Sequence, residues 1–388
     1  MTDKQAKDAI KLHQKLKGKI TIESKIRNLK LKDIQLIYTP GVAAVCEKIH
    51  KNPDQKYYLT SKANNVAIVT DGTRILGLGN IGPDAALPVM EGKAVLYKKY
   101  GKVDAFPICL NTTKKQEIIT VIKAIEPVFG AINLEDIESP KVLEIADELQ
   151  KELSIPVFHD DQHGTAVVVL AALLNSLKIV KKNTKSVKIV IAGAGSAGYG
   201  ICKLLSFAGC KNIIVVDSSG AIYQNRLENM NNYKSEIARI TNPTMQRGTL
   251  EEILKNTDVI VGVSGMSGIL SGKTIQSMNK DPIVFALTNP EPEVDPKIAK
   301  KAGAKIIATG SYLYKNKVNN AIVFPYLMRV VLDRKIKKIT LEMLYRTARA
   351  IADSVPKKDL THDNIIPEIT NPRLYKNISS SLKKLEIS

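Results

Sequence analysis

The amino-acid sequence predicts an α/β protein of two domains, an N-terminal α/β domain and a second domain with a doubly wound, mostly parallel sheet. Its 388 residues are enough for two domains of ordinary size. Short apolar runs alternate with helical patterns, as expected for parallel strands covered by helices. The alternation stops at the polar segment KKNTK (181–185) and then starts again with a glycine-rich turn, which indicates a second unit.

Four apolar runs in the first half of the chain predict the strands of the first sheet. Helical patterns lie between them, at 114–129 and 139–153, and the latter begins with Ser139 as a plausible N-cap and Pro140 at the first helical position. A charged helical pattern also covers residues 1–19. The predicted strands are NNVAIVTDG (64–72), KVDAFPICL (102–110), AINLEDI (131–137) and IPVFHDD (155–161).

Further apolar runs predict the second sheet, and an apolar helix at 164–179 bridges the two units. We place the domain boundary at or just before that helix, which gives an N-terminal domain with a helical arm at 1–160 and a second domain at 161–388. The strands predicted for the second domain are VKIVIA (187–192), NIIVVD (212–217), DVIVGVSG (258–265), PIVFALTNP (282–290) and AKIIATG (304–310).

Composition favours a soluble protein of the cytoplasm and narrows the classes of partner. No segment has the roughly 20 unbroken apolar residues that span a bilayer, and the N-terminus lacks an apolar secretory core. The four cysteines form no C-x-x-C pair, which suits a reducing compartment. A net charge of +19 raises the alternative of a nucleic-acid-binding protein. Most of the basic residues are scattered lysines, however, so we expect no nucleic acid and no membrane as partner.

The segment GAGSAG (193–198) has the G-x-G-x-x-G spacing of a dinucleotide-binding turn. It follows a predicted strand and opens a predicted helix, which is the context that this fingerprint requires. In such a turn the glycines allow a tight bend, close approach of the pyrophosphate and close helix packing, while the helix N-terminus attracts the phosphates. The predicted contacts of a Rossmann-like domain are Gly193, Gly195, Ser196, Ala197 and Gly198.

Asp217 ends the next predicted strand, near the spacing at which an acid binds the ribose hydroxyls. A carboxylate there repels a 2′-phosphate, and no basic residue follows it before Arg226. The sequence therefore favours NAD, with NADP as the alternative.

Three carboxylates stand at predicted strand ends of the first domain: Glu135 and Asp136 in INLEDI, and Asp161 in FHDDQH. Neighbouring parallel strands end at the same edge of a sheet, and oxygen ligands suit Mg²⁺ or Mn²⁺. Solvated surface acids are the plainer alternative. A zinc site through His159 and His163 is a weaker one, because a strand-to-turn context does not put the two histidines on one helical face.

Three further stretches are hard to explain as scaffold alone. Tyr38 precedes a Pro-Gly turn, Asp71 and Arg74 lie among glycines, and Lys93 lies within an apolar run. Burial of Lys93 would lower its pKa toward that of a useful base, whereas a snorkelling surface lysine is the alternative. Tyr38 could equally be a core residue.

Taken together, these stretches resemble the malic enzymes, which oxidatively decarboxylate malate. The similarity runs in order from residue 38 to 325 and covers most of the chain. One departure is SYLYKNK (311–317), where related enzymes have an arginine and an Asp-Tyr-Pro run. The matching segments are YTPGVA, VTDGTRILGLGNIG, LPVMEGKAVLYK, INLEDI, FHDDQHGTA, GAGSAG, FALTNPEPE and VNNAIVFP.

The resemblance implies a role for each matching residue. Tyr38 would be the general acid and Lys93 the general base, with Asp160 supporting Lys93. Glu135, Asp136 and Asp161 would hold Mg²⁺ or Mn²⁺, and His159 and His163 would support them. The residues that would contact the substrate are Arg74, Lys93, Asn289 and Asn320, and those that would contact the nicotinamide are Asn289, Asn319 and Asn320.

The resemblance also implies the reaction, in which malate, NAD or NADP and a divalent metal give pyruvate and CO₂, in a homodimer. A plain malate dehydrogenase or a malolactic-type enzyme remains an alternative, and so does a protein that keeps the fold without the activity. The unbroken set of Tyr38, Lys93 and the carboxylates argues against the last of these.

Overall fold

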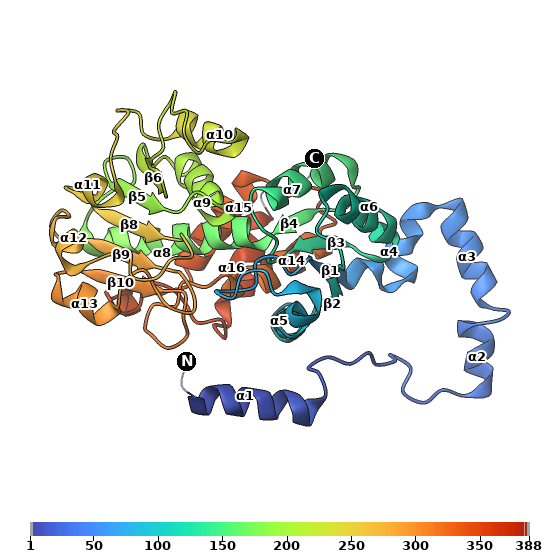
Figure 1. The fold of residues 1–388 in the computed structure, drawn as a ribbon. Helices are drawn as coiled ribbons and strands as arrows, with labels where there is room; N and C mark the ends of the chain where they lie inside the picture. Colours follow the sequence, from blue (N-terminus) through green and yellow to red (C-terminus); the bar gives the residue numbers. More distant parts are fainter. Residues whose placement is uncertain (1–2, 384, 386–388) are drawn as a thin grey trace.

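The computed structural model describes residues 3–383 and 385 and contains two parallel sheets, as the sequence predicts. The first sheet has the strand order β2-β1-β3-β4, and all four strands run parallel. Helix α5 lies on one side of this sheet, and α6 and α7 lie on the other (Figure 1). The elements are β1 (Asn65–Thr70), α5 (Gly82–Leu96), β2 (Asp104–Cys109), α6 (Lys115–Ile125), β3 (Ala131–Leu134), α7 (Lys141–Glu152) and β4 (Val157–His159).

The second sheet has the order β10-β9-β8-β5-β6-β7, in which only the short β7 runs antiparallel. The strand order reverses at β5, between β8 and β6, which is where doubly wound sheets bind ligands. Its elements are β5 (Lys188–Ala192), α9 (Ser196–Phe207), β6 (Asn212–Asp217), β7 (Gly220–Ala221), α10 (Asn232–Ile240), α11 (Leu250–Leu254), β8 (Val259–Gly262), α12 (Gly272–Gln276), β9 (Ile283–Ala286), α13 (Pro296–Lys301) and β10 (Ile306–Thr309).

Helix α8 (Thr165–Val180) joins the two halves, and most of its residues are buried. With the preceding turn it forms one helix, Asp160–Val180, that is long and apolar enough to cross a membrane by length and composition. It packs instead on α9 and on α15 (Leu341–Ala352), so its apolar surface belongs to the protein core.

After β10 the chain returns to the first sheet. Helix α14 (Phe324–Asp333) packs on the turn Tyr97–Gly101, and the contact is so close that a Cβ on Gly101 would lie 2.4 Å from the Pro325 carbonyl oxygen. Helix α16 (Arg373–Leu382) covers both α14 and α15. The C-terminal helices therefore pack against both halves of the protein.

The N-terminal arm, residues 3–60, buries none of its helical residues. Its helices are α1 (Asp3–Leu16), which confirms the predicted N-terminal helix, α2 (Leu31–Ile37), α3 (Val42–Lys51) and α4 (Lys56–Leu59). Near its start the arm touches the body, where the Lys19 backbone N–H donates to Glu91 at 3.1 Å. Beyond that point α2 and α3 stand away from the body (Figure 1).

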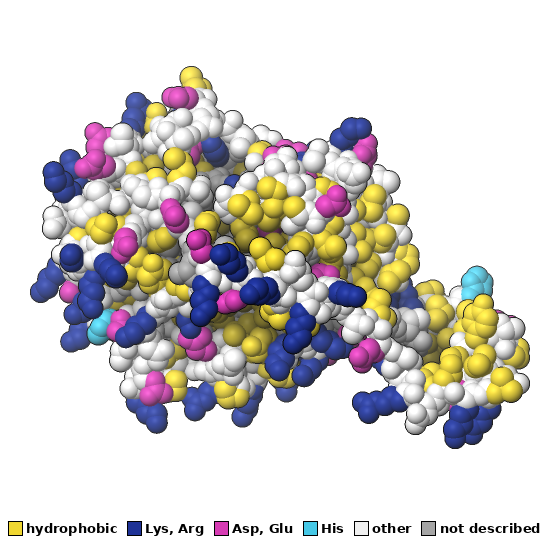
Figure 2. Space-filling model, turned by 60° about the horizontal axis from the view of Figure 1, so that its bottom comes forward, with side chains coloured by type: hydrophobic (Ala, Val, Ile, Leu, Met, Phe, Trp, Pro, Cys, Tyr) yellow, Lys and Arg dark blue, Asp and Glu magenta, His cyan; other side chains and the backbone are white. Residues whose placement is uncertain are grey.

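The basic side chains lie in separate groups over the face shown in Figure 2, with acidic side chains between them. That face carries no continuous basic strip of the kind that follows a nucleic-acid backbone. Hydrophobic side chains are instead prominent on the projecting arm and on the neighbouring part of the body.

Candidate active site at the edge of the first sheet

Lys93 is buried in helix α5, which excludes the alternative of a snorkelling surface lysine. Its Nζ donates to Glu135 Oε2 at 2.7 Å and makes a second, closer bond to Asp160 Oδ2. The ammonium group also lies 4.1 Å from the centre of the Phe324 ring, a cation–π contact. Three segments that are distant in sequence therefore surround this amine.

The environment of Lys93 corrects one expectation from the sequence. Burial alone lowers the pKa of Lys93, but the charges of Asp160 and Glu135 and the bonds to them outweigh burial and raise it above its usual value. Burial raises the pKa of Asp160 to about 7, because a single ammonium faces it while Glu135 repels it. With two carboxylates beside it, Lys93 is held as an ammonium group in this state, not as a neutral amine.

The three predicted metal ligands lie together where β3 and β4 end. The backbone N–H of Asp136 donates to Asp161 Oδ2 at 3.2 Å. Burial is the largest cause that raises the pKa of Glu135, Asp136 and Asp161, and repulsion among the carboxylates adds to it. Mutually repelling carboxylates, of which Glu135 is buried and Asp136 and Asp161 are partly exposed, are the oxygen donors that suit a hard divalent cation.

The carboxylates are nevertheless not gathered around one point. Among residues 3–383 and 385, no group of three or more His, Cys, Asp or Glu side chains is placed to hold a metal ion. Glu135 is instead engaged by Lys93 and by the Asn133 amide, at 2.9 Å. Both contacts use Oε2 and leave Oε1 of Glu135 for a metal ion.

His159 and His163 are buried and neutral. Burial lowers the pKa of His159 to about 3 and that of His163 to about 4. His163 Nδ1 accepts a bond from the His159 backbone N–H at 3.2 Å, and His159 Nδ1 lies 3.2 Å from Gln162. The rings support the turn that carries Asp160 and Asp161, as the resemblance implied.

Sequence reasoning missed two residues behind the lysine. The Tyr97 hydroxyl donates to Asn133 Oδ1 at 2.6 Å, and the Asn133 amide holds Glu135. Tyr97 also packs on Phe324, with ring centres 4.7 Å apart. A signal was present, because Lys93 and Tyr97 are four residues apart and so share a helix face.

Asn320 belongs to the site, since its amide donates to Asp160 Oδ2 at 2.6 Å. The turn at Asp160 requires Gly164, where a Cβ would lie 2.2 Å from Asp160 Oδ1 and 3.0 Å from the Asn320 Cβ. Asn319 donates to the Gly310 carbonyl at 3.1 Å, and a Cβ on Gly310 would lie 2.6 Å from the Asn289 amide. Asn289 and Asn319 therefore flank Gly310, and no hydrogen bond joins them to Lys93 in the described part of the chain.

Arg74 connects this site to the dinucleotide domain. Its backbone N–H donates to the Asp136 carbonyl at 3.1 Å, and its guanidinium approaches Gly265, where a Cβ would lie 3.1 Å from Nη2. Its neighbour Asp71 is fully buried and binds Lys141 at 2.7 Å, a structural ion pair. Arg74 also lines a cavity of about 1500 Å³ that contains the glycine-rich turn.

The glycine-rich turn has the predicted geometry. Gly193 has a φ of +122°, and a Cβ on Gly198 would lie 1.8 Å from the Gly193 carbonyl oxygen. A Cβ on Gly195 would meet no atom nearer than 4.0 Å, so the backbone there is open to a ligand. Helix α9 begins at Ser196 and continues through Ala197, directly after Gly193, Ala194 and Gly195, which line the cavity.

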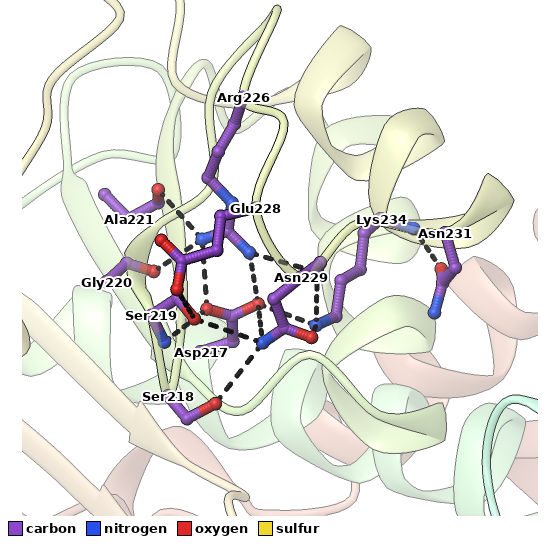
Figure 3. Close-up of polar contacts among 10 residues, drawn as sticks. All are labelled: Asp217, Ser218, Ser219, Gly220, Ala221, Arg226, Glu228, Asn229, Asn231 and Lys234. Carbon is purple, nitrogen blue, oxygen red and sulfur yellow. Dashed lines mark hydrogen bonds and ion pairs between the residues drawn. The ribbon is translucent and has the colours of Figure 1, made fainter.

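Asp217 lines the same cavity, but its carboxylate is not free. The Arg226 guanidinium donates to both of its oxygens, and Lys234 binds Oδ2 at 2.7 Å (Figure 3). Burial raises the pKa of Asp217, but the bonds from Arg226 and Lys234 lower it further, to below the usual value. The sequence favoured NAD because it placed an unpaired acid at this position. In the structure two cations neutralise that acid, so it gives no reason to prefer NAD.

Tyr38 is the one predicted catalytic residue that the structure keeps apart. It follows helix α2 on the projecting arm and is 69% exposed. The path of the arm, and not the local sequence, places it there (Figure 1).

The 311–317 loop, where the sequence departs from related enzymes, packs on the C-terminal segment. Lys315 pairs with Asp363 at 2.9 Å, and Lys317 pairs with Glu368 at 2.8 Å.

Comparison with known proteins supplies the family. The family models for the malic enzyme N-terminal domain and the malic enzyme NAD-binding domain match residues 16–117 and 162–382. A bifunctional malic/malolactic enzyme of Bacillus subtilis is 46% identical over 97% of this chain and 92% of its own length. An NAD-dependent malic enzyme of Geobacillus stearothermophilus is 48% identical over 94% of this chain and 76% of its own.

A solved structure agrees with the sequence comparisons. The NAD-dependent malic enzyme of Thermotoga maritima superposes with a TM-score of 0.93, at 45% identity, over 97% of this chain and 99% of that one. With the buried lysine, the strand-end carboxylates and the dinucleotide turn in place, this chain belongs to the malic enzyme family, the decarboxylating malate oxidoreductases.

Proposed function

We propose that the protein oxidatively decarboxylates L-malate to pyruvate and CO₂, with NAD or NADP as hydride acceptor and Mg²⁺ or Mn²⁺ as a cofactor. The observation that supports this most is Lys93, which is buried between Asp160 and Glu135 at an edge that Arg74 connects to the dinucleotide cavity. A base, an acidic cluster and a dinucleotide turn close to one another are what coupled hydride and proton transfer requires.

Glu135, Asp136 and Asp161 would hold the divalent ion. Such an ion supplies Lewis-acid chemistry, which polarises a carbonyl oxygen and stabilises the negative charge left when CO₂ departs. A divalent ion bound beside Lys93 would lower the pKa of the lysine, because a nearby positive charge disfavours its ammonium form.

The remaining residues of the site orient malate and move its protons. Neutral Lys93 removes the hydroxyl proton as hydride leaves for the nicotinamide, while Asp160 keeps the amine aimed at that oxygen. The guanidinium of Arg74 forms a fork that matches a substrate carboxylate. Asn289, Asn319 and Asn320 contact substrate and nicotinamide, and Tyr38 returns a proton to C3.

The Bacillus subtilis relative carries a specific second candidate, because its name includes malolactic activity. A malolactic enzyme turns malate into lactate and CO₂ with no net gain of reduced cofactor. The two reactions differ only in the fate of pyruvate and the hydride, so the products distinguish them.

The deciding experiment incubates the purified full-length protein with L-malate, Mn²⁺ and either NAD or NADP. Absorbance follows reduced cofactor, and end-point assays measure pyruvate and lactate. Pyruvate that forms in equal amount to reduced cofactor, and only with metal, is the expected result. Lactate without reduced cofactor would establish the malolactic reaction, and reduced cofactor without pyruvate would establish plain dehydrogenation. Absence of every product would overturn the proposal.

We also propose that the protein is a homodimer in which the arm of one copy completes the site of the other. Helices α2 and α3 bury nothing within one chain, although Leu31 and Leu36 are 78% and 70% exposed. Exposed apolar surface of this kind marks a contact with another molecule. Tyr38 lies on the same arm, so a second copy that covers the apolar surface can bring its tyrosine to Lys93.

Mixed dimers test this arrangement. Tyr38→Phe and Lys93→Met each inactivate a homodimer, and unfolding and refolding the two together forms mixed dimers. When the site is shared, one of the two sites in a mixed dimer carries both substitutions and the other carries none. About a quarter of the wild-type activity then returns for random pairing in a two-fold dimer. A site built within one chain regains no activity, and that result would refute the shared site.

A further inference from the structure

A carboxylate that takes no part in the proposed reaction is fully buried where β8 and β9 end. Glu293 follows β9, and none of its surface is exposed. Its Oε2 accepts from the Thr288 backbone N–H at 3.1 Å, and its Oε1 accepts from the Thr288 hydroxyl. A Cβ on Gly262, the last residue of β8, would lie 2.4 Å from the Glu293 Cδ. Both strand ends therefore pack closely around this side chain.

The hydrogen-bond partners of Glu293 suit its charged form. Burial raises the pKa of this carboxyl group, and the bonds from Thr288 and from the backbone N–H groups of Glu293 and Ser264 oppose that rise. These partners donate to both oxygens of the side chain. A carboxylate only accepts hydrogen bonds, whereas a protonated acid has to donate one itself.

The charge on Glu293 has no opposite charge beside it. In the described part of the chain no lysine, arginine or histidine forms an ion pair with it, and no cation contributes to its pKa. Asp160 and Asp217, by contrast, each face a lysine or an arginine. A buried charge without a counter-charge carries a desolvation cost that a positively charged ligand group can offset.

Glu293 stands directly behind the wall of the dinucleotide cavity. The Thr288 hydroxyl that donates to Glu293 accepts from the Gly265 backbone N–H at 3.1 Å. Ser264 and Met266, on either side of Gly265, line the cavity. One layer of backbone therefore separates the carboxylate from the space that a ligand would occupy.

This part of the wall belongs to the nicotinamide half of the cavity. In the strand order β8 and β9 lie on one side of β5, and β6 lies on the other. A dinucleotide whose pyrophosphate sits at the turn after β5 thus extends its adenosine toward β6 and its nicotinamide toward β8 and β9. Arg74, the proposed substrate ligand, approaches the same wall at Gly265.

We propose that the Glu293 carboxylate is the counter-charge of the oxidised nicotinamide ring and raises the affinity of the cavity for NAD⁺ relative to NADH. The oxidised ring carries a positive charge and the reduced ring carries none, so a fixed negative charge behind the wall favours the oxidised form. Glu293 acts through the wall as a positioning residue, and it promotes release of the reduced cofactor. This inference rests on the dinucleotide-dependent reaction proposed above.

The test compares two cofactors that differ in the charge of the nicotinamide ring. Binding of NAD⁺ and of NADH to the full-length protein is measured by titration calorimetry at about pH 8, without malate or metal. In Glu293→Gln the affinity for NAD⁺ should fall about five- to ten-fold relative to that for NADH, as expected for one charge acting through a thin layer of protein. An unchanged ratio of the two affinities would overturn the proposal.

Two further variants separate the charge from the structure of the loop. Glu293→Asp keeps the charge on a shorter side chain, so both affinities should fall together and their ratio should stay within about two-fold of wild type. Glu291→Gln is the matched control, because Glu291 is exposed on the same loop and its charge is screened by water. A ratio that changes as much in either variant as in Glu293→Gln would refute the assignment to the buried charge.

The wild-type protein decides if Glu293→Gln does not fold. With the counter-charge in place it should bind NAD⁺ at least as tightly as NADH, and a preference for NADH of more than about ten-fold would overturn the proposal. Absence of binding of either cofactor would overturn it as well. The assay needs no turnover, so a protein that shows the expected ratios but makes no pyruvate would refute the proposed reaction and leave this inference standing.

Discussion

Two buried ion-pair clusters at the strand ends of the two sheets use the same side-chain chemistry in opposite proportions. In the first, Lys93 faces Asp160 and Glu135, with Asp136 and Asp161 alongside. In the second, Asp217 faces Arg226 and Lys234. The first has an excess of carboxylates and suits a cation, whereas in the second two cations hold one carboxylate and bind the loop that follows β6.

The pKa directions of the two clusters follow from this difference. Burial is the largest cause at Glu135, Asp136 and Asp161, where carboxylate repulsion adds to it and the pKa values rise. Burial also opposes ionisation of Asp217, but two cations overcome it and its pKa falls. The number of opposite charges within reach, and not burial alone, decides the sign of the shift.

The largest effect is expected from a substitution that breaks the first cluster. Replacing its buried lysine, in Lys93→Met, removes the base and should lower kcat on the order of 10³-fold, within the range for loss of general acid–base catalysis. Steady-state kinetics with malate and Mn²⁺ measure this. Binding of 5′-AMP in the dinucleotide cavity should be unchanged. A kcat within ten-fold of wild type would show that Lys93 is not the base.

A smaller effect is expected from removing one carboxylate. Asp136→Asn should weaken Mn²⁺ binding on the order of 100-fold, because the site loses a charged oxygen ligand. Titration calorimetry with Mn²⁺ alone measures the affinity, and Glu138→Gln, an exposed acid on the same loop, is the control. Equal affinity in both variants would exclude Asp136 as a ligand.

The same chemical change should affect stability with opposite sign in the two clusters. Asp217→Asn leaves two cations without a carboxylate and should lower the free energy of unfolding by about 2 kcal/mol, below the range for fully buried pairs because Lys234 is partly exposed. Asp136→Asn relieves repulsion and should raise the metal-free value by about 1 kcal/mol. Urea unfolding measures both, and equal signs would contradict the comparison.

The last expected effect is a pH dependence without metal. The pKa of Asp160 is about 7 in the folded protein and about 4 when unfolded. Between pH 4 and 7 this carboxyl group therefore holds its proton in the folded state only, and its contribution to stability should fall as pH rises through that window, by about 4 kcal/mol at most. The lowered pKa values of His159 and His163 act in the opposite direction below about pH 6.5. Unfolding midpoints of the wild type and of Asp160→Asn at several pH values separate the two contributions. A difference between the two proteins that stays constant from pH 4 to 7 would show that Asp160 does not titrate in this window.

Local sequence was sufficient for the sheets and the glycine turn, because apolar runs and fixed spacings encode them. It placed Glu135, Asp136 and Asp161 at one edge, since parallel strands end together. It could not give the pKa of Lys93, which depends on how many carboxylates the fold brings to it. Nor could spacing show that Arg226 and Lys234 turn back onto Asp217.

Tyr38 illustrates a different limit. Motif matching assigned it a role, but its position depends on the path of an arm that buries nothing within its own chain. Tyr97 and Asn133 were missed for the opposite reason. They match no catalytic pattern, and only the packing of α5 on the first sheet shows that they hold Glu135.

The bond between Asn320 and Asp160 has a mechanical consequence. The chain passes from the first sheet to the second just after β4 and returns after β10, and these two crossings meet at this bond. A rotation of the two halves relative to each other would take place about such a meeting point. Such a rotation would leave Lys93 beside Asp160 near the axis and would change the separation of Arg74 and Gly265 farther out. The lysine and its carboxylates are thus already assembled without substrate, whereas the contact of Arg74 with the dinucleotide domain would depend on the angle between the two halves.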